Sequence, residues 1–331
     1  MQNAEMEGVF HSILCLSKKG MVIKMKPKIF IDGRDGTTGL QIYDRLNGRD
    51  DIELLLIDES NPEDAIERKK LINKADLVFL CLPDEIALES VSFIENDNTC
   101  VIDASTAHRV ASGWVYGLPE LSESQRECLR AAKRVSNPGC HSTGAILLLK
   151  PLVETGVIPP DHPLTITSVT GYTGGGMKMI NEYEEADREE CSELNAPRLY
   201  STGASHKHIP EIMRYTGITA APVFMPLVAD YPQGMQVIIP LHLPDRRREV
   251  IEAITENYAG CLNIDVLVDS PVFAASNFNA NTDKVTLRIL GFDDKIILTA
   301  QFDNLGKGAS GAAVQNMNIM LGFNEYERLR L

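Results

Sequence analysis

The stretch that decides the fold reads Lys28-Ile29-Phe30-Ile31-Asp32 and continues as Gly33-Arg34-Asp35-Gly36-Thr37-Thr38-Gly39. Its first five residues form an apolar run that stops at a glycine, as a short buried β-strand does. A helical pattern of apolar residues begins directly after Gly39. A strand, a glycine loop and a helix in this order open a dinucleotide-binding unit. The spacing is G-x-x-G-x-x-G rather than G-x-G-x-x-G, and the alternative is a glycine-rich turn without a ligand.

Three further apolar runs extend this pattern along the chain. We expect strands over Glu53–Asp58, Leu77–Leu82 and Cys100–Asp103, with charged helical segments such as Ala65–Lys74 and Glu85–Glu95 between them. Strands that are apolar throughout and alternate with helices indicate a parallel sheet that is covered on both faces. The first part of the chain is therefore predicted to be an α/β domain.

The pattern changes after about residue 163. Longer runs with partial alternation follow, and fewer helical segments separate them; these runs are Leu164–Thr170, Gln236–Pro244, Asp265–Val272, Val285–Leu290 and Lys295–Asn304. They predict an α+β domain with a mixed, largely antiparallel sheet. The apolar stretch Gly311–Gly322 is expected to be a buried helix.

A cysteine in the run Ser136-Asn137-Pro138-Gly139-Cys140-His141-Ser142-Thr143-Gly144 is the strongest functional signal. Pro138 and Gly139 indicate a tight turn, and a helical pattern follows Cys140. At a helix N-terminus, the dipole and the free N–H groups favour a thiolate and can hold a developing oxyanion. We therefore interpret Cys140 as a nucleophile; the alternative is a buried, inert cysteine.

Length and charge narrow the function classes. The 331 residues are enough for two domains of ordinary size. A net charge of −14 argues against binding to nucleic acids or membrane surfaces, because both require a basic face. No apolar run reaches the ~18 residues that a membrane span needs. Residues 1–26 lack the features of a signal peptide, and we expect them to be an extension outside the fold.

The cysteines argue against a disulfide framework and against a structural zinc site. The chain has seven, an odd number, and none of them forms a C-x-x-C pair. This pattern is typical of a protein in the reducing cytoplasm. We expect no metal site.

Several motifs together resemble the short form of the N-acetyl-gamma-glutamyl-phosphate reductase family. The matching segments are Gly33–Gly39, Asp103–Arg109, Tyr116–Leu121, Ser136–Gly144, Gly171–Gly176, His206–Glu211 and Lys307–Asn318. The resemblance covers nearly everything from residue 27 onward. It implies a fold like that of glyceraldehyde-3-phosphate dehydrogenase: a Rossmann NADP-binding domain over 27–138, completed by 307–331, and a catalytic and oligomerisation domain over 139–306. It also implies a homodimer or homotetramer.

The reaction that the resemblance implies is the NADPH-dependent reduction of an acyl phosphate to an aldehyde, with release of phosphate, in arginine biosynthesis. Cys140 would attack the acyl carbon, and the resulting thioester would accept a hydride. The family motif places the acid/base at His208, and His206 is the rival. An unperturbed imidazole titrates near neutral pH, so it can both donate a proton and take it back. Binding of the anionic substrate is expected from Ser105, Arg109, Lys207 and Lys178, since cations and hydroxyls suit phosphate and carboxylate groups.

The cofactor residues implied by the resemblance are Gly33, Arg34, Gly36, Thr37, Thr38, Gly39, Ser60 and Asn316. Asp58 conflicts with this choice of cofactor. A carboxylate at the end of the second strand usually binds the ribose 2′-hydroxyl and favours NAD, whereas the family prefers NADP. The residues alone leave this conflict open.

Two competing functions remain at this point. Aspartate-semialdehyde dehydrogenase shares the two-domain plan and the chemistry, with a different acyl group. A nonenzymatic NADP-binding regulator would keep the fold without the activity, and the presence of Cys140, Arg109 and His208 argues against it.

Overall fold

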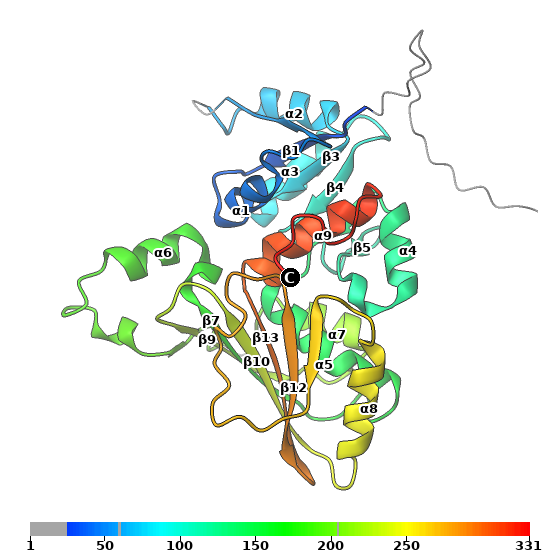
Figure 1. The fold of residues 1–331 in the computed structure, drawn as a ribbon. Helices are drawn as coiled ribbons and strands as arrows, with labels where there is room; N and C mark the ends of the chain where they lie inside the picture. The colour runs from blue at the N-terminus through cyan, green and yellow to red at the C-terminus, as the bar shows by residue number, and fades with distance from the viewer. Residues whose placement is uncertain (1–24, 59–60, 204) are drawn as a thin grey trace, which may run out of the picture.

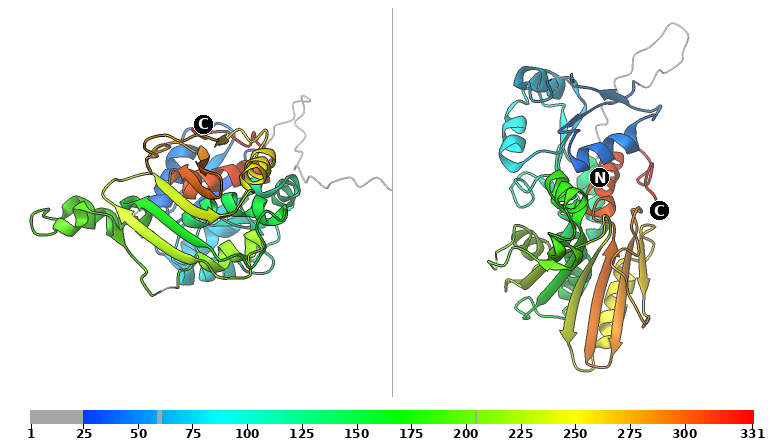
Figure 2. Two further views of the ribbon diagram at one scale, coloured as in Figure 1. Left: turned by 90° about the horizontal axis from the view of Figure 1, so that it is seen from below. Right: turned by 90° about the vertical axis from the view of Figure 1, so that its left-hand side faces the viewer.

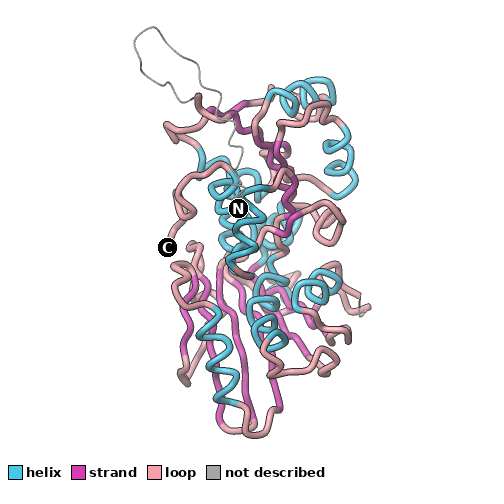
Figure 3. The backbone as a smooth tube through the Cα atoms, turned by 90° about the vertical axis from the view of Figure 1, so that its right-hand side faces the viewer, coloured by secondary structure: helices cyan, strands magenta, loops and turns pink. Residues whose placement is uncertain are grey.

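The computed structural model describes residues 25–58, 61–203 and 205–331. Two β-sheets lie in separate halves of the molecule (Figure 3), and α9 (Gly311–Met320) lies between them (Figure 1). Residues 1–24 of the expected extension, and the predicted cofactor residue Ser60, lie outside the described residues.

The first sheet is parallel, as predicted. In the described chain its order is β2-β1-β3-β4-β6-β5, and every neighbouring pair is parallel. The strands are β1 (Lys28–Asp32), β2 (Glu53–Leu55), β3 (Leu77–Leu80), β4 (Cys100–Asp103), β5 (Val115–Tyr116) and β6 (Arg134–Ser136). From β1 the chain runs to β2 on one side and then to β3 on the other. The order therefore reverses beside β1, the place where such sheets bind ligands.

Helices cover both faces of this sheet. Ile29 and Ile31 of β1 pack on one face with α1 (Thr37–Leu46), α4 (Glu123–Ala131) and α9. Phe30 packs on the opposite face with α2 (Ala65–Lys74) and α3 (Asp84–Ser92). Successive strand residues point to opposite faces, which explains why the three central residues of β1 are all apolar.

The second sheet is mixed and largely antiparallel, also as predicted. Its order is β11-β12-β13-β10-β7-β9-β8 in the described chain, with parallel pairs only at β11–β12 and β7–β9. The strands are β7 (Thr165–Gly171), β8 (Arg198–Leu199), β9 (Val223–Ala229), β10 (Met235–His242), β11 (Ile264–Leu267), β12 (Val285–Phe292) and β13 (Lys295–Phe302).

One face of the second sheet is buried by helices α5 (Cys140–Glu154), α7 (Ile209–Thr216) and α8 (Arg247–Asn257), as Figure 2 shows. Helix α6 (Gly176–Glu185) projects to the side and packs with a separate cluster around Tyr172 and Tyr183 (Figure 2, left). Short turns complete the fold: η1 (Pro119–Leu121), η2 (Tyr172–Gly175), η3 (Ser192–Asn195) and the π-helical turn η4 (Gly306–Ser310).

The sequence pattern missed several elements and overextended others. It did not predict the short strands β5, β6 and β8, nor β9, where Pro226 interrupts the apolar run. Strand β2 ends at Leu55, three residues before the predicted end at Asp58. The domain boundary at 138/139 stays a prediction, although it falls directly between β6 and α5.

The described residues, taken as a whole, have the following properties with respect to membrane-spanning helices, disulfides and metal-binding clusters. None of its helices is both long and apolar enough to cross a bilayer. The cysteines that it includes are free thiols. Nowhere in it do three or more His, Cys, Asp or Glu side chains come together in a way that could hold a metal ion.

Candidate active site

The loop Gly33–Gly39 between β1 and α1 leaves a concave space that side chains at its glycine positions would occupy; we call it the glycine cradle. Gly33 has φ +85°, and a Cβ atom there would lie 2.5 Å from the carbonyl oxygen of Cys81. A Cβ at Gly39 would lie 2.3 Å from the carbonyl oxygen of Gly33. Helix α1 then begins at Thr37 with no acidic residue in its first turn and no side-chain cap. Its N-terminal N–H groups are therefore available to the pyrophosphate of a dinucleotide.

Two cavities meet at this loop. The first, which we call the cysteine cavity, has a volume of about 520 Å³ and extends from Thr37 and Thr38 to Cys140, His208 and Gly308. The second, the loop cavity, has about 530 Å³ and is lined by residues that include Gly33, Arg34, Ile57 and Arg68. Gly36, Cys81 and Leu82 line both cavities. A long ligand can thus pass over the glycine loop, with one end in each cavity.

Cys140 is the first residue of α5, as predicted, and partly faces the cysteine cavity. Strand β6 ends at Ser136, so the first sheet places the cysteine. The turn η4 closes in from the other side, where a Cβ on Gly308 would lie 3.0 Å from the Cβ of Cys140. A side chain at position 308 would therefore be crowded against Cys140.

The thiol pKa differs from the sequence-based expectation. Burial raises the pKa of Cys140 above its ordinary value. The positive charges of Arg109 and Lys207 and the backbone N–H of His141 lower it, but they do not overcome the burial. The expectation that the helix N-terminus keeps a thiolate is therefore wrong for the free protein, because loss of water around the sulfur outweighs the helix.

The raised pKa predicts a slow thiol in the free protein. Alkylation by iodoacetamide requires the thiolate, so its rate at Cys140 should rise with pH through an inflection above the ~8.5 of an ordinary cysteine. The rate is measured by peptide mass spectrometry, with exposed Cys128 of the same chain as the internal reference. An inflection below pH ~7 at Cys140 would contradict this account.

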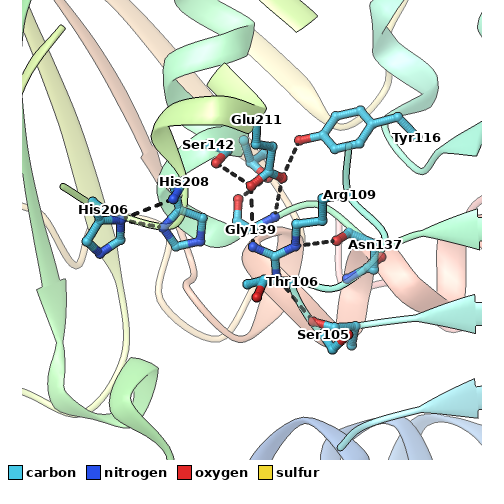
Figure 4. Close-up of polar contacts among 12 residues, drawn as sticks. Ser105, Thr106, Arg109, Tyr116, Asn137, Gly139, Ser142, His206, His208 and Glu211 are labelled. Carbon is cyan, nitrogen blue, oxygen red and sulfur yellow. Dashed lines mark hydrogen bonds and ion pairs between the residues drawn. The ribbon is translucent and has the colours of Figure 1, made fainter. Parts of the chain in front are cut away.

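A buried carboxylate that sequence reasoning missed joins the parts of the site (Figure 4). Glu211 on α7 is 1% exposed. Its Oε1 accepts hydrogen bonds from the Tyr116 hydroxyl at 2.6 Å and the Gly139 N–H at 2.8 Å. Its Oε2 accepts from the Ser142 hydroxyl at 2.7 Å and from Nη1 of Arg109 at 3.3 Å. Glu211 thus connects the turn before Cys140, the first turn of α5, and the predicted anion-binding arginine.

Arg109 is fixed from several sides. Its Nε donates to the carbonyl oxygen of Asn137 at 3.1 Å, and its Nη2 donates to that of Ala104 at 3.1 Å. The Tyr215 hydroxyl donates to its backbone oxygen at 2.7 Å. Arg109 follows β4 and Cys140 follows β6, and these strands are neighbours in the sheet. Adjacent carboxyl ends therefore bring the guanidinium to the cysteine.

His208 packs directly against Gly139, the residue before the cysteine. A Cβ at Gly139 would approach Nε2 of the His208 ring to 2.2 Å and Nη1 of Arg109 to 2.3 Å. His206 stacks on the far side of His208 at a centroid distance of 4.8 Å (Figure 4). Burial lowers the pKa of His208 well below its usual value, with His141 and Arg109 acting in the same direction. Burial and Lys207 lower the pKa of His206 to about 4.

His141 also lines the cysteine cavity but is fully engaged. Its Nδ1 pairs with the Ser168 hydroxyl at 2.6 Å and its Nε2 with the Tyr200 hydroxyl at 2.7 Å. Burial lowers its pKa to about 3, so the ring is neutral at physiological pH. A neutral ring held by two hydroxyls orients Tyr200, a cavity residue that sequence reasoning did not single out.

The other predicted substrate residues divide into two groups. Arg109 and Lys207 line the cysteine cavity. Ser105 does not, because its hydroxyl donates to Oδ2 of Asp103 at 2.7 Å. Lys178 is exposed on α6 and lies outside the cavity lining. The structure therefore gives no support for direct substrate contacts by Ser105 or Lys178. The Ser105 hydroxyl is already bonded to Asp103, and Lys178 is exposed to solvent.

Of the predicted cofactor residues that the structure describes, Gly33, Arg34, Gly36, Thr37, Thr38 and Gly39 lie at the glycine loop, whereas Asn316 does not. It is buried on α9, and its Nδ2 donates to the carbonyl oxygen of Gly117 at 2.9 Å and to Oδ1 of Asn137 at 3.2 Å. Asn137 lines the cavity, but Asn316 lies behind it. A direct contact of Asn316 with the cofactor, which the resemblance implied, is thus not supported; its side chain instead holds Asn137, a residue of the cavity wall.

Family models match residues 57–128, described as a semialdehyde dehydrogenase NAD binding domain, and residues 140–304, described as a semialdehyde dehydrogenase dimerisation domain. Among solved structures, aspartate semialdehyde dehydrogenase II of Vibrio cholerae is 14% identical with a TM-score of 0.69, and the match covers 90% of this chain and 99% of that one. The enzyme from Candida albicans, solved with NADP, is 15% identical with a TM-score of 0.60, covering 90% and 99%. These likenesses confirm the predicted fold class.

Curated relatives are much closer in sequence. N-acetyl-gamma-glutamyl-phosphate reductase 2 of Nostoc sp. is 45% identical over 317 residues, which cover 91% of this chain and 98% of the relative. The protein of the same name from Pseudomonas putida is 46% identical over 307 residues, covering 89% and 97%. The resemblance seen in the sequence motifs is confirmed. The chain belongs to the N-acetyl-gamma-glutamyl-phosphate reductase family.

Proposed function

We propose that this protein reduces N-acetyl-L-glutamyl 5-phosphate to N-acetyl-L-glutamate 5-semialdehyde with NADPH, releases phosphate, and thereby serves arginine biosynthesis. The family membership and the geometry around Cys140 support this function. The reaction needs a nucleophile, a group that moves protons, a site for anions and a place for the dinucleotide, and the two joined cavities offer candidates for each.

The charge of the cysteine cavity favours this substrate over its main competitor. Of the described residues that line the cavity, none is Asp or Glu, and the permanently charged ones are Arg109 and Lys207. N-acetyl-glutamyl phosphate carries only negative groups, because its amine is acylated. Aspartyl phosphate carries a free ammonium, which would meet positive charges without a partner and would be costly to bury there. We therefore favour the N-acylated substrate.

The glycine cradle and the uncapped start of α1 fit a dinucleotide. Gly33, Gly36 and Gly39 would allow close approach to the pyrophosphate, and Thr37 and Thr38 face the cysteine cavity. NADPH, when bound, supplies the hydride that reduces the acyl group.

Cys140 and His208 would exchange one proton during the reaction. In the free protein both are neutral, since burial raises the pKa of the thiol and lowers that of the imidazole. His208 would take the thiol proton as the sulfur attacks the acyl carbon and phosphate leaves. The imidazolium would later give that proton to the oxygen of the thiohemiacetal. As the C–S bond breaks, His208 would take the hydroxyl proton back and pass it to the departing sulfur, which frees the aldehyde and restores the thiol. The anionic substrate, held by Arg109, would favour the transient positive charge on His208.

The test compares acyl phosphates with the purified protein. We expect NADPH oxidation, followed by its absorbance, with N-acetyl-glutamyl phosphate. With β-aspartyl phosphate, kcat/KM should be lower by about 100-fold or more, because an unpaired charge must be desolvated. N-acetyl-β-aspartyl phosphate is the matched control, and acylation should recover part of the loss. Faster turnover of the free-amine substrate than of both acylated ones would overturn the proposal.

The partner of this chain is proposed to be a second copy of itself. The matched family model over 140–304 is described as a dimerisation domain. Helices bury one face of the second sheet, whereas Ile297 on β13 and Phe292 on β12 are 40% and 65% exposed. A homodimer through the part of this face that carries Ile297 and Phe292 would bury them; a homotetramer would need a further surface. A cytoplasmic location suits the free thiols.

A further inference from the structure

We infer that Tyr200 donates a hydrogen bond to an oxygen atom of the bound acyl phosphate, and that buried Ser168 and His141 turn the Tyr200 hydroxyl proton toward the cysteine cavity. The inference deepens the proposed function and rests on it for the identity of the substrate. Tyr200 is the residue that contacts the substrate, whereas Ser168 and His141 act through it as positioning residues.

Tyr200 reaches the cysteine cavity from the edge of the second sheet. It directly follows β8, the last strand in the order of that sheet, and it lines the cavity together with Cys140. Its backbone N–H donates to the carbonyl oxygen of Pro226 on β9 at 3.1 Å, which continues the pairing of β8 with β9 by one residue. The backbone at Tyr200 is therefore fixed, and its half-buried side chain can present the hydroxyl to a ligand.

Three side chains form a hydrogen-bonded chain that runs from the protein interior to the cavity. Ser168 on β7 is 0% exposed, and His141 on α5 is 2% exposed. The Ser168 hydroxyl pairs with Nδ1 of His141 at 2.6 Å, and Nε2 of His141 pairs with the Tyr200 hydroxyl at 2.7 Å. Because burial lowers the pKa of His141 to about 3, the ring is neutral and carries a single N–H. One ring nitrogen therefore donates and the other accepts.

The buried end of this chain decides which nitrogen of His141 carries the proton. Among the described residues, Nδ1 of His141 is the one hydrogen-bond partner of the Ser168 hydroxyl. A buried hydroxyl proton without an acceptor is costly, so Ser168 donates to Nδ1. The proton of the ring then lies on Nε2, and Nε2–H donates to the Tyr200 oxygen. The opposite tautomer would leave the Ser168 proton in the interior without an acceptor.

This arrangement leaves the Tyr200 proton available to the cavity. In the described part of the chain the Tyr200 hydroxyl pairs with His141 alone, and a hydroxyl that accepts from Nε2 keeps its own proton for a further acceptor. An acyl phosphate presents many acceptor oxygens. The charged groups of the cavity lining, Arg109 and Lys207, are donors as well, so Tyr200 adds an uncharged donor to a site that is complementary to such a ligand.

Two further observations fit a donor close to the reacting sulfur. Cys140 and His141 are consecutive residues of α5, and His141 holds the Tyr200 hydroxyl. Burial raises the pKa of Tyr200, and a negative charge on Cys140 raises it further. The hydroxyl therefore keeps its proton at neutral pH and remains a donor while the sulfur reacts.

The first test removes the hydroxyl. Tyr200→Phe keeps the half-buried ring, so the fold should persist. Its kcat/KM for N-acetyl-glutamyl phosphate should fall by about 10- to 100-fold, the range for losing a hydrogen bond to a charged group. NADPH affinity, measured by calorimetry, should be unchanged. The matched control is Tyr326→Phe, which removes the hydroxyl of a tyrosine outside the cavity lining and should change neither quantity.

A double-mutant cycle separates positioning of Tyr200 from a general effect on the structure. Ser168→Ala removes the donor to Nδ1, so the ring proton can move to Nδ1 and the Tyr200 hydroxyl can turn to donate to Nε2. In the unaltered background kcat/KM should fall by about 10-fold. In the Tyr200→Phe background the same substitution should change kcat/KM by less than about twofold, because no hydroxyl is left to orient.

Nitrogen NMR of the free protein reads the tautomer without any substrate. The His141 signals, identified as those that change in Ser168→Ala, should be those of the Nε2–H tautomer at neutral pH. An Nδ1–H tautomer, an equal loss from Ser168→Ala in both backgrounds, or an unchanged kcat/KM in Tyr200→Phe overturns the inference. If the unaltered protein does not reduce N-acetyl-glutamyl phosphate, the proposed function fails instead, and the same variants are compared on the acyl phosphate that the protein does reduce.

Discussion

Cys140→Ser should lower kcat for reduction of N-acetyl-glutamyl phosphate by about 10⁴-fold or more, the scale of losing a covalent nucleophile. A serine hydroxyl fits the same space, but its proton is far harder to remove than that of a thiol. NADPH affinity should stay within about threefold, because the glycine cradle and the loop cavity are untouched. The two quantities are measured by steady-state kinetics and by calorimetry on the same preparation.

The matched control for this variant is Cys128→Ser. Cys128 is exposed on α4 and lines neither cavity. The control should retain full activity. If Cys140→Ser kept more than about a tenth of the activity, the sulfur would not be the group that attacks the acyl carbon.

Glu211→Gln should lower kcat by about 100-fold while NADPH binding persists. The two carboxylate oxygens accept from four donors, on Arg109, Tyr116, Gly139 and Ser142. An amide keeps the shape but turns one acceptor into a donor, so two of these donors face an N–H group. Small displacements of the reacting groups cost about 10²-fold in rate. Steady-state kinetics check this value.

Glu211→Ala separates positioning from stability. It leaves the charge of Arg109 buried without its partner, and the free energy of unfolding should fall by about 3–5 kcal/mol. Urea denaturation measures this change. Glu249→Gln, on the exposed face of α8, is the control and should change neither quantity. An unchanged kcat in Glu211→Gln would mean that this carboxylate does not position the site.

The fold could be predicted for those elements that the local pattern of apolar residues and glycines is enough to identify. Buried strands such as β1 and β3 are apolar on both faces, and the glycine loop between β1 and α1 gives the site its first anchor. Strands β5 and β6 were missed because two or three residues cannot show a period. Strand β9 was missed because Pro226 reads as a break, yet a ladder on both sides holds the strand together.

Site residues could be predicted where a sequence motif identifies the side chain. They could not be predicted where contacts between distant segments of the chain determine the role of the side chain. Cys140 could be found because a tight turn precedes it and a helical pattern follows it, and Arg109 because it lies in a quoted motif just beyond a predicted strand. Glu211 was within a quoted motif, but its four partners come from three other segments of the chain, which no spacing reveals. The raised pKa of Cys140 likewise follows from burial among these segments, whereas the sequence shows only the helix start that would lower it.

The central claim is that the sulfur of Cys140 carries the acyl group. Protein mixed with N-acetyl-glutamyl phosphate in the absence of NADPH, quenched in acid and digested, should show the Cys140 peptide heavier by one N-acetylglutamyl group. The adduct should disappear when NADPH is added before the quench. An unmodified Cys140 peptide, or the same added mass on another residue, would contradict the account.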